Sequence, residues 1–230
     1  MKIGLLIIAT GKYNKFVAPL LKSANKHFLN NHQVTFYVFT DDQNILNQKK
    51  DNMISLYKEH RPWPYPTLSR YSEFCKYREI LSKEDYLFYC DADMLFVSGV
   101  SDEVLEDSVA TIHPGYRGGR GTPETRKEST AYISPNEGVI YYAGGFNGGA
   151  AEVFLAMSEI ISKNISIDME NNIIAIWHDE SHMNRYFVNN TPTLALSPSY
   201  CYPERASLPF EKKILALDKN HKEIRNGDFK

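Results

Sequence analysis

The sequence has few cysteines, almost no net charge and no long hydrophobic run. Its three cysteines include no pair spaced Cys-x-x-Cys, which disfavours a disulfide framework. A formal net charge of −2 gives no reason to expect a nucleic acid or an anionic membrane as partner. The apolar start of the chain lacks a signal-peptide cleavage pattern and is too short to span a bilayer. We therefore expect a soluble cytoplasmic protein.

Two common nucleotide-binding motifs are also absent. The sequence contains no Gly-x-Gly-x-x-Gly and no Gly-x-x-x-x-Gly-Lys-Ser/Thr, which disfavours a dinucleotide-binding fold and a P-loop. It also contains no internal repeat. What is present is a chain of 230 residues, 43% of them hydrophobic, long enough to bury the core of one large domain or of two closely joined halves.

Segments typical of strands alternate with segments typical of helices. Apolar residues at helical spacing occupy 15–29 and 67–82, and the strand-like segments are 2–9, 34–40, 53–57, 86–97, 108–113, 139–142 and 193–197. This alternation predicts an α/β fold in which helices pack on a parallel or mixed sheet. Ligands of such sheets bind beyond the carboxyl ends of the strands, where residues 10–13 and 91–93 are expected.

Two carboxylates one residue apart, Asp91 and Asp93, interrupt the strand-like segment 86–97. Buried carboxylates are costly unless a positive charge lies beside them, and their oxygens suit Mg²⁺ or Mn²⁺ bound together with phosphate. One interpretation is therefore a metal–diphosphate site, and the other is a strand-end turn with solvated aspartates. A haloacid-dehalogenase-like phosphotransferase is disfavoured, because Leu95 stands where that motif has Thr or Val.

A second polar cluster, residues 177–182, follows an isoleucine-rich segment that we expect to emerge from the core into a cleft. Two histidines four residues apart, His178 and His182, favour zinc only with Glu in a fixed position, but Asp179 and Ser181 occupy the two diagnostic positions. Zinc is therefore disfavoured. The acids at 179 and 180 could instead belong to the first turn of a helix, where the dipole favours negative charge.

Glycine and cationic residues mark three further segments. The glycines of 141–149 permit either close approach of a ligand to the backbone or a tight turn. The segment 114–130 is the longest predicted loop and could cover a site. The tail from Lys212 is cationic, and by composition alone it is typical of a solvated terminus.

In their order, these segments resemble the retaining glycosyltransferases that include the blood-group A and B transferases and α-1,3-galactosyltransferase. The resemblance covers nearly the whole chain and rests on residues 37–41, 91–93, 111–116, 141–146, 177–184, 196–198 and 219–221. It implies a GT-A fold, in which a nucleotide-binding sheet with helices on both faces joins an acceptor-binding half. We expect a bacterial or viral type of member, because the animal enzymes' transmembrane anchor and stem have no counterpart here.

The resemblance also implies a division of the chain. The nucleotide-binding half is expected at about 1–115, the acceptor half at about 116–211, and a cationic tail that closes over the donor at 212–230. This reverses the interpretation of the tail that composition favours. The expected cofactor is Mn²⁺ or Mg²⁺, held by Asp91 and Asp93.

On the donor side, the resemblance assigns roles to twelve residues. Ile8 and Tyr13 are expected to contact uracil or ribose, and Asp179 to bind hydroxyls of the donor sugar. Arg70 is expected near the donor, and Asp91 and Asp93 are the expected metal pair. The residues expected to line or tune the sugar position are Ala143, Gly144 and Gly145. The cations expected on the diphosphate are Lys219, His221 and Arg225.

On the acceptor side, His113, Thr122 and Trp177 match positions that hold a galactose. Glu180 matches the carboxylate that faces the anomeric carbon, as a nucleophile or as a stabiliser of an oxocarbenium-like state that also contacts the acceptor. An acidic acceptor contact of the animal enzymes is replaced here by Pro203, next to Glu204.

Together these matches imply transfer of GalNAc or Gal from a UDP-sugar, in α-1,3 linkage, to a terminal β-galactoside that we expect to be fucosylated. The acceptor would be an oligosaccharide or a glycolipid. GalNAc is the expected sugar, because Gly145 lacks a Cβ where the N-acetyl group would lie. The alternative is a catalytically silent protein that binds UDP or sugar, although such a protein has little need for Asp91, Asp93, Glu180 and the cationic tail together.

Overall fold

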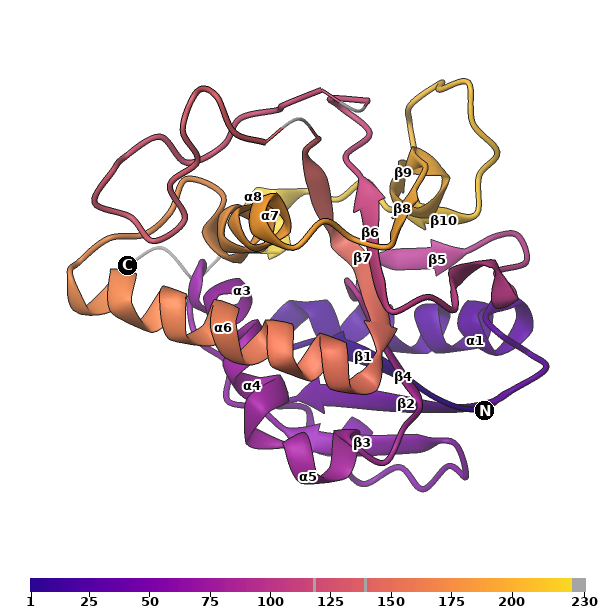
Figure 1. Cartoon of the computed structure of the whole chain (residues 1–230). Helices are drawn as coiled ribbons and strands as arrows, with labels where there is room; N and C mark the ends of the chain where they lie inside the picture. The colour runs from indigo at the N-terminus through magenta and orange to yellow at the C-terminus, as the bar shows by residue number, and fades with distance from the viewer. Residues whose placement is uncertain (118, 139, 225–230) are drawn as a thin grey trace.

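The computed structural model describes residues 1–117, 119–138 and 140–224. A seven-stranded mixed sheet forms its centre (Figure 1), in the strand order β3-β2-β1-β4-β7-β6-β8. The strands are β1 (Lys2–Ile8), β2 (Gln33–Thr40), β3 (Met53–Tyr57), β4 (Tyr86–Cys90), β6 (Ser108–Ile112), β7 (Tyr142–Ala150) and β8 (Leu194–Leu196).

The first four strands of this sheet are parallel, and β7 runs antiparallel between β4 and β6. Strand β1 lies in the middle of the parallel part, pairing Leu5 with Phe36 of β2 on one side and with Phe88 of β4 on the other. All three side chains are buried. Continuous apolar runs of this kind are typical of strands that helices cover on both faces.

Helices cover both faces of the sheet. The helix α1 (Val17–His27) follows a 3₁₀ turn, η1 (Gly11–Phe16), and buries Leu20 and Ala24 in one hydrophobic core. On the other face, α4 (Arg70–Lys76), α6 (Ala151–Glu170) and α7 (His178–Asn189) contribute Phe74, Phe154 and Met183 to a second core. The shorter helices are α2 (Gln43–Leu46), α3 (Tyr65–Leu68), α5 (Arg78–Leu81) and α8 (His221–Ile224), with 3₁₀ turns η2 (Asp102–Val104) and η3 (Pro198–Cys201).

A small second sheet joins the C-terminal segment to the middle of the chain. It has the order β5-β10-β9, formed by β5 (Met94–Phe96), β10 (Ile214–Ala216) and β9 (Tyr202–Pro203). Directly after β10, the amide of Leu217 donates to the Asp93 carbonyl over 2.9 Å. This pairing places the residues that follow Leu217 next to the Asp91–Asp93 turn.

Four expectations about local structure are wrong. The predicted strand 86–97 is two strands in different sheets, because the chain turns at Asp91–Asp93. The predicted helix 67–82 is broken into α3, α4 and α5. The predicted strand 139–142 lies mostly before the real strand, which is the glycine-rich run of β7. The isoleucine-rich segment before α7 was expected to lie in the core, but it lies largely at the surface, since Ile174 and Ile176 are 40% and 52% exposed.

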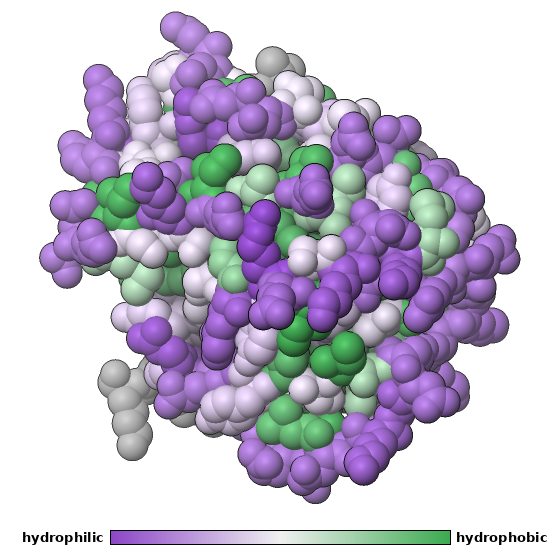
Figure 2. All heavy atoms as spheres, turned by 60° about the horizontal axis from the view of Figure 1, so that its bottom comes forward, coloured by the Kyte–Doolittle hydropathy of each residue, from purple (hydrophilic) through white to green (hydrophobic). Residues whose placement is uncertain are grey.

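Figure 2 brings the lower side of Figure 1 forward and shows a largely hydrophilic face with small, separate apolar patches. Within the described ranges, no helix combines the length and apolar character that crossing a membrane requires.

Candidate active site

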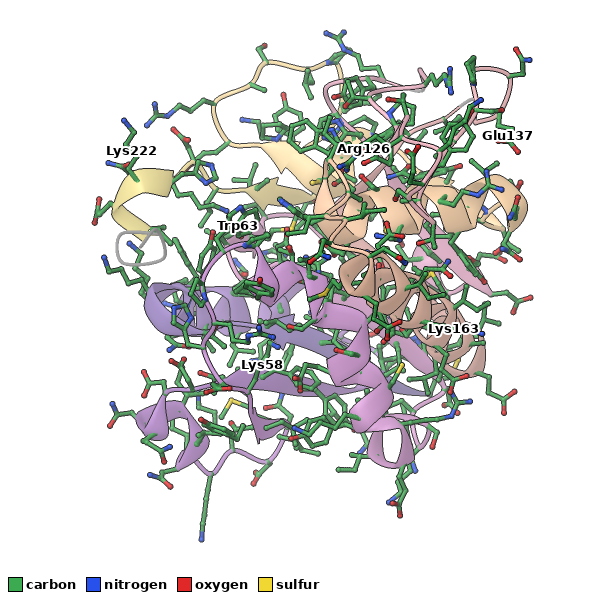
Figure 3. All side chains as sticks on the ribbon, turned by 90° about the vertical axis from the view of Figure 1, so that its left-hand side faces the viewer. Lys58, Trp63, Arg126, Glu137, Lys163 and Lys222 are labelled. Atoms are coloured by element: carbon green, nitrogen blue, oxygen red, sulfur yellow. The ribbon has the colours of Figure 1, made fainter. Side chains whose placement is uncertain are left out.

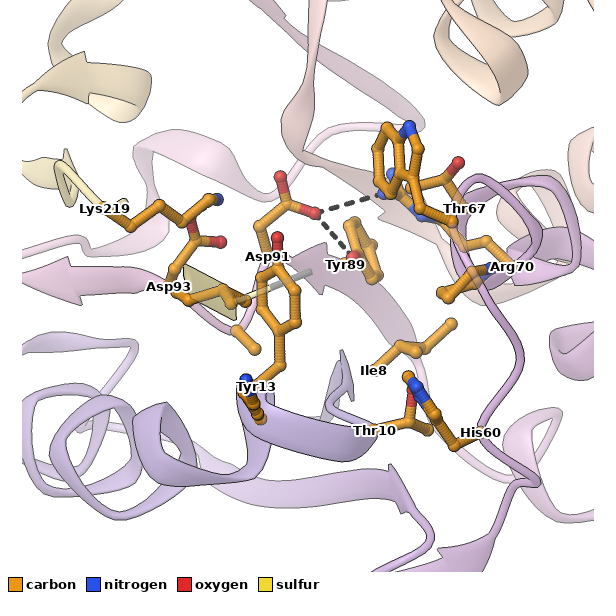
Figure 4. Close-up of a pocket in the computed structure, with 15 residues that line it drawn as sticks. Ile8, Thr10, Tyr13, His60, Thr67, Arg70, Tyr89, Asp91, Asp93 and Lys219 are labelled. Atoms are coloured by element: carbon orange, nitrogen blue, oxygen red, sulfur yellow. Dashed lines mark hydrogen bonds and ion pairs between the residues drawn. The ribbon is translucent and has the colours of Figure 1, made fainter. Parts of the chain in front are cut away.

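The first cavity lies at the carboxyl ends of β1 and β4 (Figure 4), where the strand order changes direction. The connections from β1 lead to β2 and β3 on one side, whereas β4 lies on the other. Such a switch point leaves a crevice above the sheet, because the flanking connections diverge. The cavity is lined by Ile8, Thr10, Lys12, Tyr13, His60, Trp63, Pro66, Thr67, Arg70, Tyr89, Asp91, Ala92, Asp93, Lys219 and Ile224.

The two aspartates of this cavity lie beside cationic and hydroxyl groups. Asp91 accepts hydrogen bonds at Oδ1 from Arg70 (3.1 Å) and from the Tyr89 hydroxyl (2.6 Å), as Figure 4 shows. Asp93 forms an ion pair with Lys219. Each carboxylate is therefore compensated, as the cost of burying an unpaired charge requires.

Arg70 connects three parts of the site. It is only 5% exposed and stands over the Tyr89 ring at 3.9 Å from the ring centroid. Besides Asp91, its guanidinium donates to the Gly144 carbonyl over 3.0 Å and lies 3.1 Å from an oxygen of Asp179. A planar group with five donors can serve several acceptors at fixed angles, so Arg70 fixes β4, β7 and α7 relative to one another.

A bulge in β7 brings Gly144 to this arginine. The β6 residues Ala110 and Thr111 are adjacent, but their partners on β7 are Asn147 and Ala143, so residues 144–146 bulge out of the ladder. Bulges of this kind re-aim the backbone next to active sites. Here the Gly144 carbonyl accepts from Arg70, while its amide donates to the Glu180 carboxylate over 2.8 Å.

The acids Asp179 and Glu180 occupy the first turn of α7, which is one of the two alternatives that the sequence left open, and they also line the second cavity described below. Burial raises the pKa of Glu180 to about 7, against the lowering effect of the Gly144 hydrogen bond. Burial likewise raises the pKa of Asp179 to about 6, although the nearby Arg70 opposes this shift. A glutamate with this pKa exists in both protonation states near neutral pH, which is common for catalytic carboxyl groups.

A second cavity joins these acids to the aspartates. It is lined by Trp63, Thr67, Arg70, Asp91, Gly144, Gly145, Trp177, His178, Asp179, Glu180 and His221. It shares Trp63, Thr67, Arg70 and Asp91 with the first cavity, so the two are parts of one site. His178 begins α7 with a φ of +54°, a strained backbone conformation for a non-glycine residue and a frequent feature of functional sites.

The predicted acceptor residues lie on and beside the long segment between β6 and β7. The Trp177 indole donates to the Thr122 hydroxyl over 2.7 Å, and that hydroxyl is 2.8 Å from the hydroxyl of Tyr116. His113 stacks near Tyr116, with ring centroids 4.6 Å apart. Thr122 thus couples two aromatic side chains into a wall beside the second cavity.

Residues 1–226 match the model of glycosyltransferase family 6. The chain belongs to this family. It is 34% identical over 244 residues to globoside α-1,3-N-acetylgalactosaminyltransferase 1 of Gallus gallus, covering 98% of this chain and 70% of that protein. It is 35% identical over 238 residues to histo-blood group ABO system transferase 1 of Rattus norvegicus, covering 97% and 68%. It is also 34% identical over 224 residues to the O-antigen biosynthesis glycosyltransferase WbnI of Escherichia coli, covering 95% of each chain.

These matches confirm the resemblance predicted from the sequence, and the mixed sheet flanked by helices is of the GT-A type. Membership of the family supports glycosyl transfer as the activity. The strands that carry the site come from both of the predicted halves, since β7 and β8 belong to the second half by sequence and to the one large sheet by structure. The division into two halves and a tail stays a prediction.

Most of the residues that sequence reasoning assigned to the site line one cavity or the other. Ile8, Tyr13, Asp93 and Lys219 line the first, while Gly145, Trp177, Asp179, Glu180 and His221 line the second, with Gly144 between Arg70 and Glu180. Ala143 is buried among core side chains at 3% exposure, and it is not among the lining residues of either cavity. Pro203 lies in β9. Arg225 falls outside the described residues.

Sequence reasoning missed His60, Trp63 and Thr67. All three follow β3 and line the first cavity, and Trp63 also packs edge-on against His178 with ring centroids 5.0 Å apart. A signal was available, because Trp63 lies between Pro62 and Pro64 in the connection that follows the parallel strand β3, at the same sheet edge as the aspartates. Thr10 and Lys12 also line the first cavity, as predicted from their position after the carboxyl end of the first strand.

The two aspartates are better suited to a divalent cation that a bound ligand also coordinates than to one that protein side chains coordinate alone. Across the residues with assigned structure, no group of three or more His, Cys, Asp and Glu side chains converges to hold a metal. Both side-chain hydrogen bonds to Asp91 end on Oδ1, whereas its Oδ2 lies 3.4 Å from where a Cβ on Gly145 would stand. Mg²⁺ is commonly held by one or two carboxylates together with substrate phosphates and water, which matches this donor set.

Proposed function

We propose that this glycosyltransferase moves GalNAc, or Gal, from its UDP-sugar to the 3-hydroxyl of a terminal, fucosylated β-galactoside with retention of configuration. The observation that carries the proposal is that Glu180 and Asp91 line one cavity beside Trp177. A carboxylate is thereby available to the sugar, with the diphosphate on one side and an aromatic wall on the other. The relatives' names, which include α-1,3-N-acetylgalactosaminyltransferase, support α-1,3 transfer.

The donor side is suited to a nucleoside diphosphate. Tyr13 and Ile8 offer apolar surface at the end of β1 for the base and ribose, and Lys219 supplies a positive charge at the Asp93 end. Cations at this position stabilise the charge that develops on a departing diphosphate. A divalent cation held by Asp91 and Asp93 would neutralise the same charge as a Lewis acid.

Glu180 is the residue placed to stabilise the reacting carbon. As the bond between the anomeric carbon and the diphosphate oxygen breaks, positive charge develops on the sugar, and the ionised carboxylate compensates it or forms a transient bond to it. The acceptor O3 then bonds to the anomeric carbon on the face that UDP leaves, and its proton passes to the departing diphosphate. The Gly144 amide holds the carboxylate in place during both events.

The preference for GalNAc rests on Gly145. A Cβ at this position would lie 3.2 Å from the sulfur atoms of Cys201 and Met94 and 3.4 Å from Asp91 Oδ2. A methyl group there would press on packed side chains next to the metal-binding carboxylate and reduce the room for an N-acetyl group. Discrimination by one methyl group is worth about 1–3 kcal/mol.

The proposal is tested by UDP release from UDP-GalNAc and UDP-Gal, with Mn²⁺ or EDTA, and with or without 2′-fucosyllactose. We expect acceptor-stimulated, EDTA-sensitive release that is faster with UDP-GalNAc. Equal or faster turnover of UDP-Gal would refute the donor preference, and release that survives EDTA would refute the metal role. A protein that binds UDP but releases none from either donor would be the silent binder.

A further inference from the structure

The loop between β6 and β7 carries a buried charge cluster that the proposed chemistry does not use. Glu124 is only 2% exposed, although it lies on a long loop. Its partner Arg126 is half exposed and donates to both carboxylate oxygens, over 3.0 Å from Nε and 2.6 Å from Nη2. This side-chain pairing holds the pKa of Glu124 at about 2, so the charge persists throughout the physiological range.

The same pair is bonded to the segment that leads into α7. Glu124 Oε2 accepts a hydrogen bond of 2.9 Å from the Ile176 amide, and Arg126 Nη2 donates to the Ile174 carbonyl over 2.6 Å. One acid and one base thereby hold alternate peptide groups of residues 174–176. Residues 171–177 belong to no strand, so these bonds, together with the 3.0 Å bond from the Trp177 amide to the Ser181 hydroxyl, fix where the segment runs.

Both ends of this clamp lie close in sequence to the acceptor wall. Thr122 is two residues before Glu124, and Trp177 directly follows Ile176. Within the wall, the Trp177 indole donates a 2.7 Å hydrogen bond to Thr122. Glu180 lies about one helical turn after Trp177, and its amide donates to the Trp177 carbonyl over 3.0 Å. A shift of the clamp would therefore move the wall relative to the catalytic carboxylate.

We infer that Glu124, held by Arg126, is a positioning residue for the acceptor: it fixes the Thr122–Trp177 wall at the distance from Glu180 that places a galactose hydroxyl at the anomeric carbon. The inference rests on the proposed transfer to a galactoside. Glu124 lies outside both cavities and acts through Ile176 and Arg126. Misplacement of a substrate by a distant change can cost as much rate as loss of a direct contact.

A second glutamate on the same loop gives a matched control. Glu137 is 39% exposed and accepts a 3.1 Å hydrogen bond from Arg185 of α7. It is therefore also an ion-paired glutamate of this loop, but it pairs directly with α7 and away from the wall, whereas Glu124 pairs within the loop and bonds to the segment before α7. Figure 3 shows the two residues apart, with Arg126 in the upper centre of the view and Glu137 at its upper right edge.

The test is steady-state transfer to 2′-fucosyllactose at saturating donor, together with acceptor-free hydrolysis of the same donor. For Glu124→Gln we expect the KM for acceptor to rise at least tenfold, while the KM for donor and the rate of hydrolysis stay within about twofold of the unaltered protein. Glu137→Gln should leave all three quantities within about twofold. Arg126→Gln, which removes a half-exposed side chain and keeps Glu124, should raise the acceptor KM by a smaller factor.

Two results would overturn the inference. One is an unchanged acceptor KM in folded Glu124→Gln protein, and the other is an equal loss of hydrolysis and transfer, which indicates general damage to the site. If Glu124→Gln does not fold, the acceptor KM and the hydrolysis rate of Arg126→Gln decide by the same two criteria. Failure of the proposed function is distinct, because the unaltered protein would then hydrolyse donor with no stimulation by any galactoside.

Discussion

The carboxylate of Glu180 accepts a 2.8 Å hydrogen bond from the backbone amide of Gly144. The amide is available because β7 bulges away from β6 at residues 144–146, and it is close because a glycine presents no side chain there. A Cβ at this position would lie 3.3 Å from the same carboxylate oxygen. The backbone thus orients the proposed catalytic group without a side chain that could move.

Replacement of Glu180, the proposed catalytic carboxylate, should separate binding from chemistry. In Glu180→Gln, the amide oxygen can still accept from Gly144, but the negative charge that we propose faces the anomeric carbon is lost. We expect transfer to fall by about 10²–10³-fold, as for loss of other groups that stabilise transition-state charge, with UDP affinity by calorimetry unchanged. Glu128→Gln, on the exposed part of the long loop, is the control. Near-normal transfer by Glu180→Gln would remove the assigned role.

The activity should depend on pH through Glu180. Its pKa is raised to about 7 by burial, so the ionised, active form is lost as pH falls through 7. We expect kcat/KM to rise from pH 5 to a plateau above about pH 8, one unit past that pKa, with one ionisation near 7. A rate profile that is flat between pH 6 and 8 would contradict this assignment.

The same shift has the opposite sign for stability. An acid whose pKa is higher in the folded than in the unfolded protein binds more protons when folded, so the free energy of unfolding decreases as pH rises between the two values. For Glu180 this window runs from 4.5 to about 7. Urea unfolding of Glu180→Gln should show less of this decrease than the unaltered protein.

Loss of Arg70 should destabilise the fold as well as the site. Arg70→Met leaves Asp179 buried without its counter-ion, and breaking one partner of a buried pair costs about 3–5 kcal/mol. Arg78→Met removes an arginine from an exposed pair with Glu159, where the expected cost is about 0–1 kcal/mol. Urea unfolding of both variants measures the difference, and equal destabilisation would show that Arg70 does not compensate the acids.

Substitution of Asp93 should act through the diphosphate. In Asp93→Asn, we expect the affinity for UDP in Mn²⁺ to fall to the value that the unaltered protein shows in EDTA, because one of two metal-binding carboxylates is lost. The metal role of Asp93 is the proposal under test, and calorimetric titration with UDP in both conditions gives the comparison. If Asp93→Asn retains a difference between Mn²⁺ and EDTA equal to that of the unaltered protein, Asp93 does not hold the metal.

Gly145→Ala should shift the donor preference toward UDP-Gal. The added methyl group would crowd Cys201 and Met94 at 3.2 Å, so part of its effect could come from displaced neighbours. The double variant Gly145→Ala/Cys201→Ala relieves the contact with the thiol. Competition between the two donors should show the same shift in both variants. A shift that disappears in the double variant would attribute it to packing instead of donor contact.

The sequence predicted the edge of the sheet that carries the site, because two carboxylates after a run of strand-forming residues have few stable surroundings. It did not predict β7, since glycine has a low strand propensity. Its neighbours impose the strand: a Cβ at Gly148 would lie 2.3 Å from the ring of Phe88 on β4, so only glycine allows such close pairing. Glu124 was missed for a related reason. Its role depends on a contact with Ile176, 52 residues away.

The parts of the site that we propose for the donor and for the acceptor differ in how the chain builds them. The aspartates stand at a turn between two sheets, whereas Thr122 belongs to a single excursion of the chain that leaves the sheet after β6 and returns at β7. An insertion of this kind is bounded by two strands that already pair with each other. Exchange of the whole β6–β7 segment among family members, with Glu124 and Arg126 retained so that Trp177 keeps its place, would therefore test whether a chimaera keeps its nucleotide-sugar and takes a new glycan.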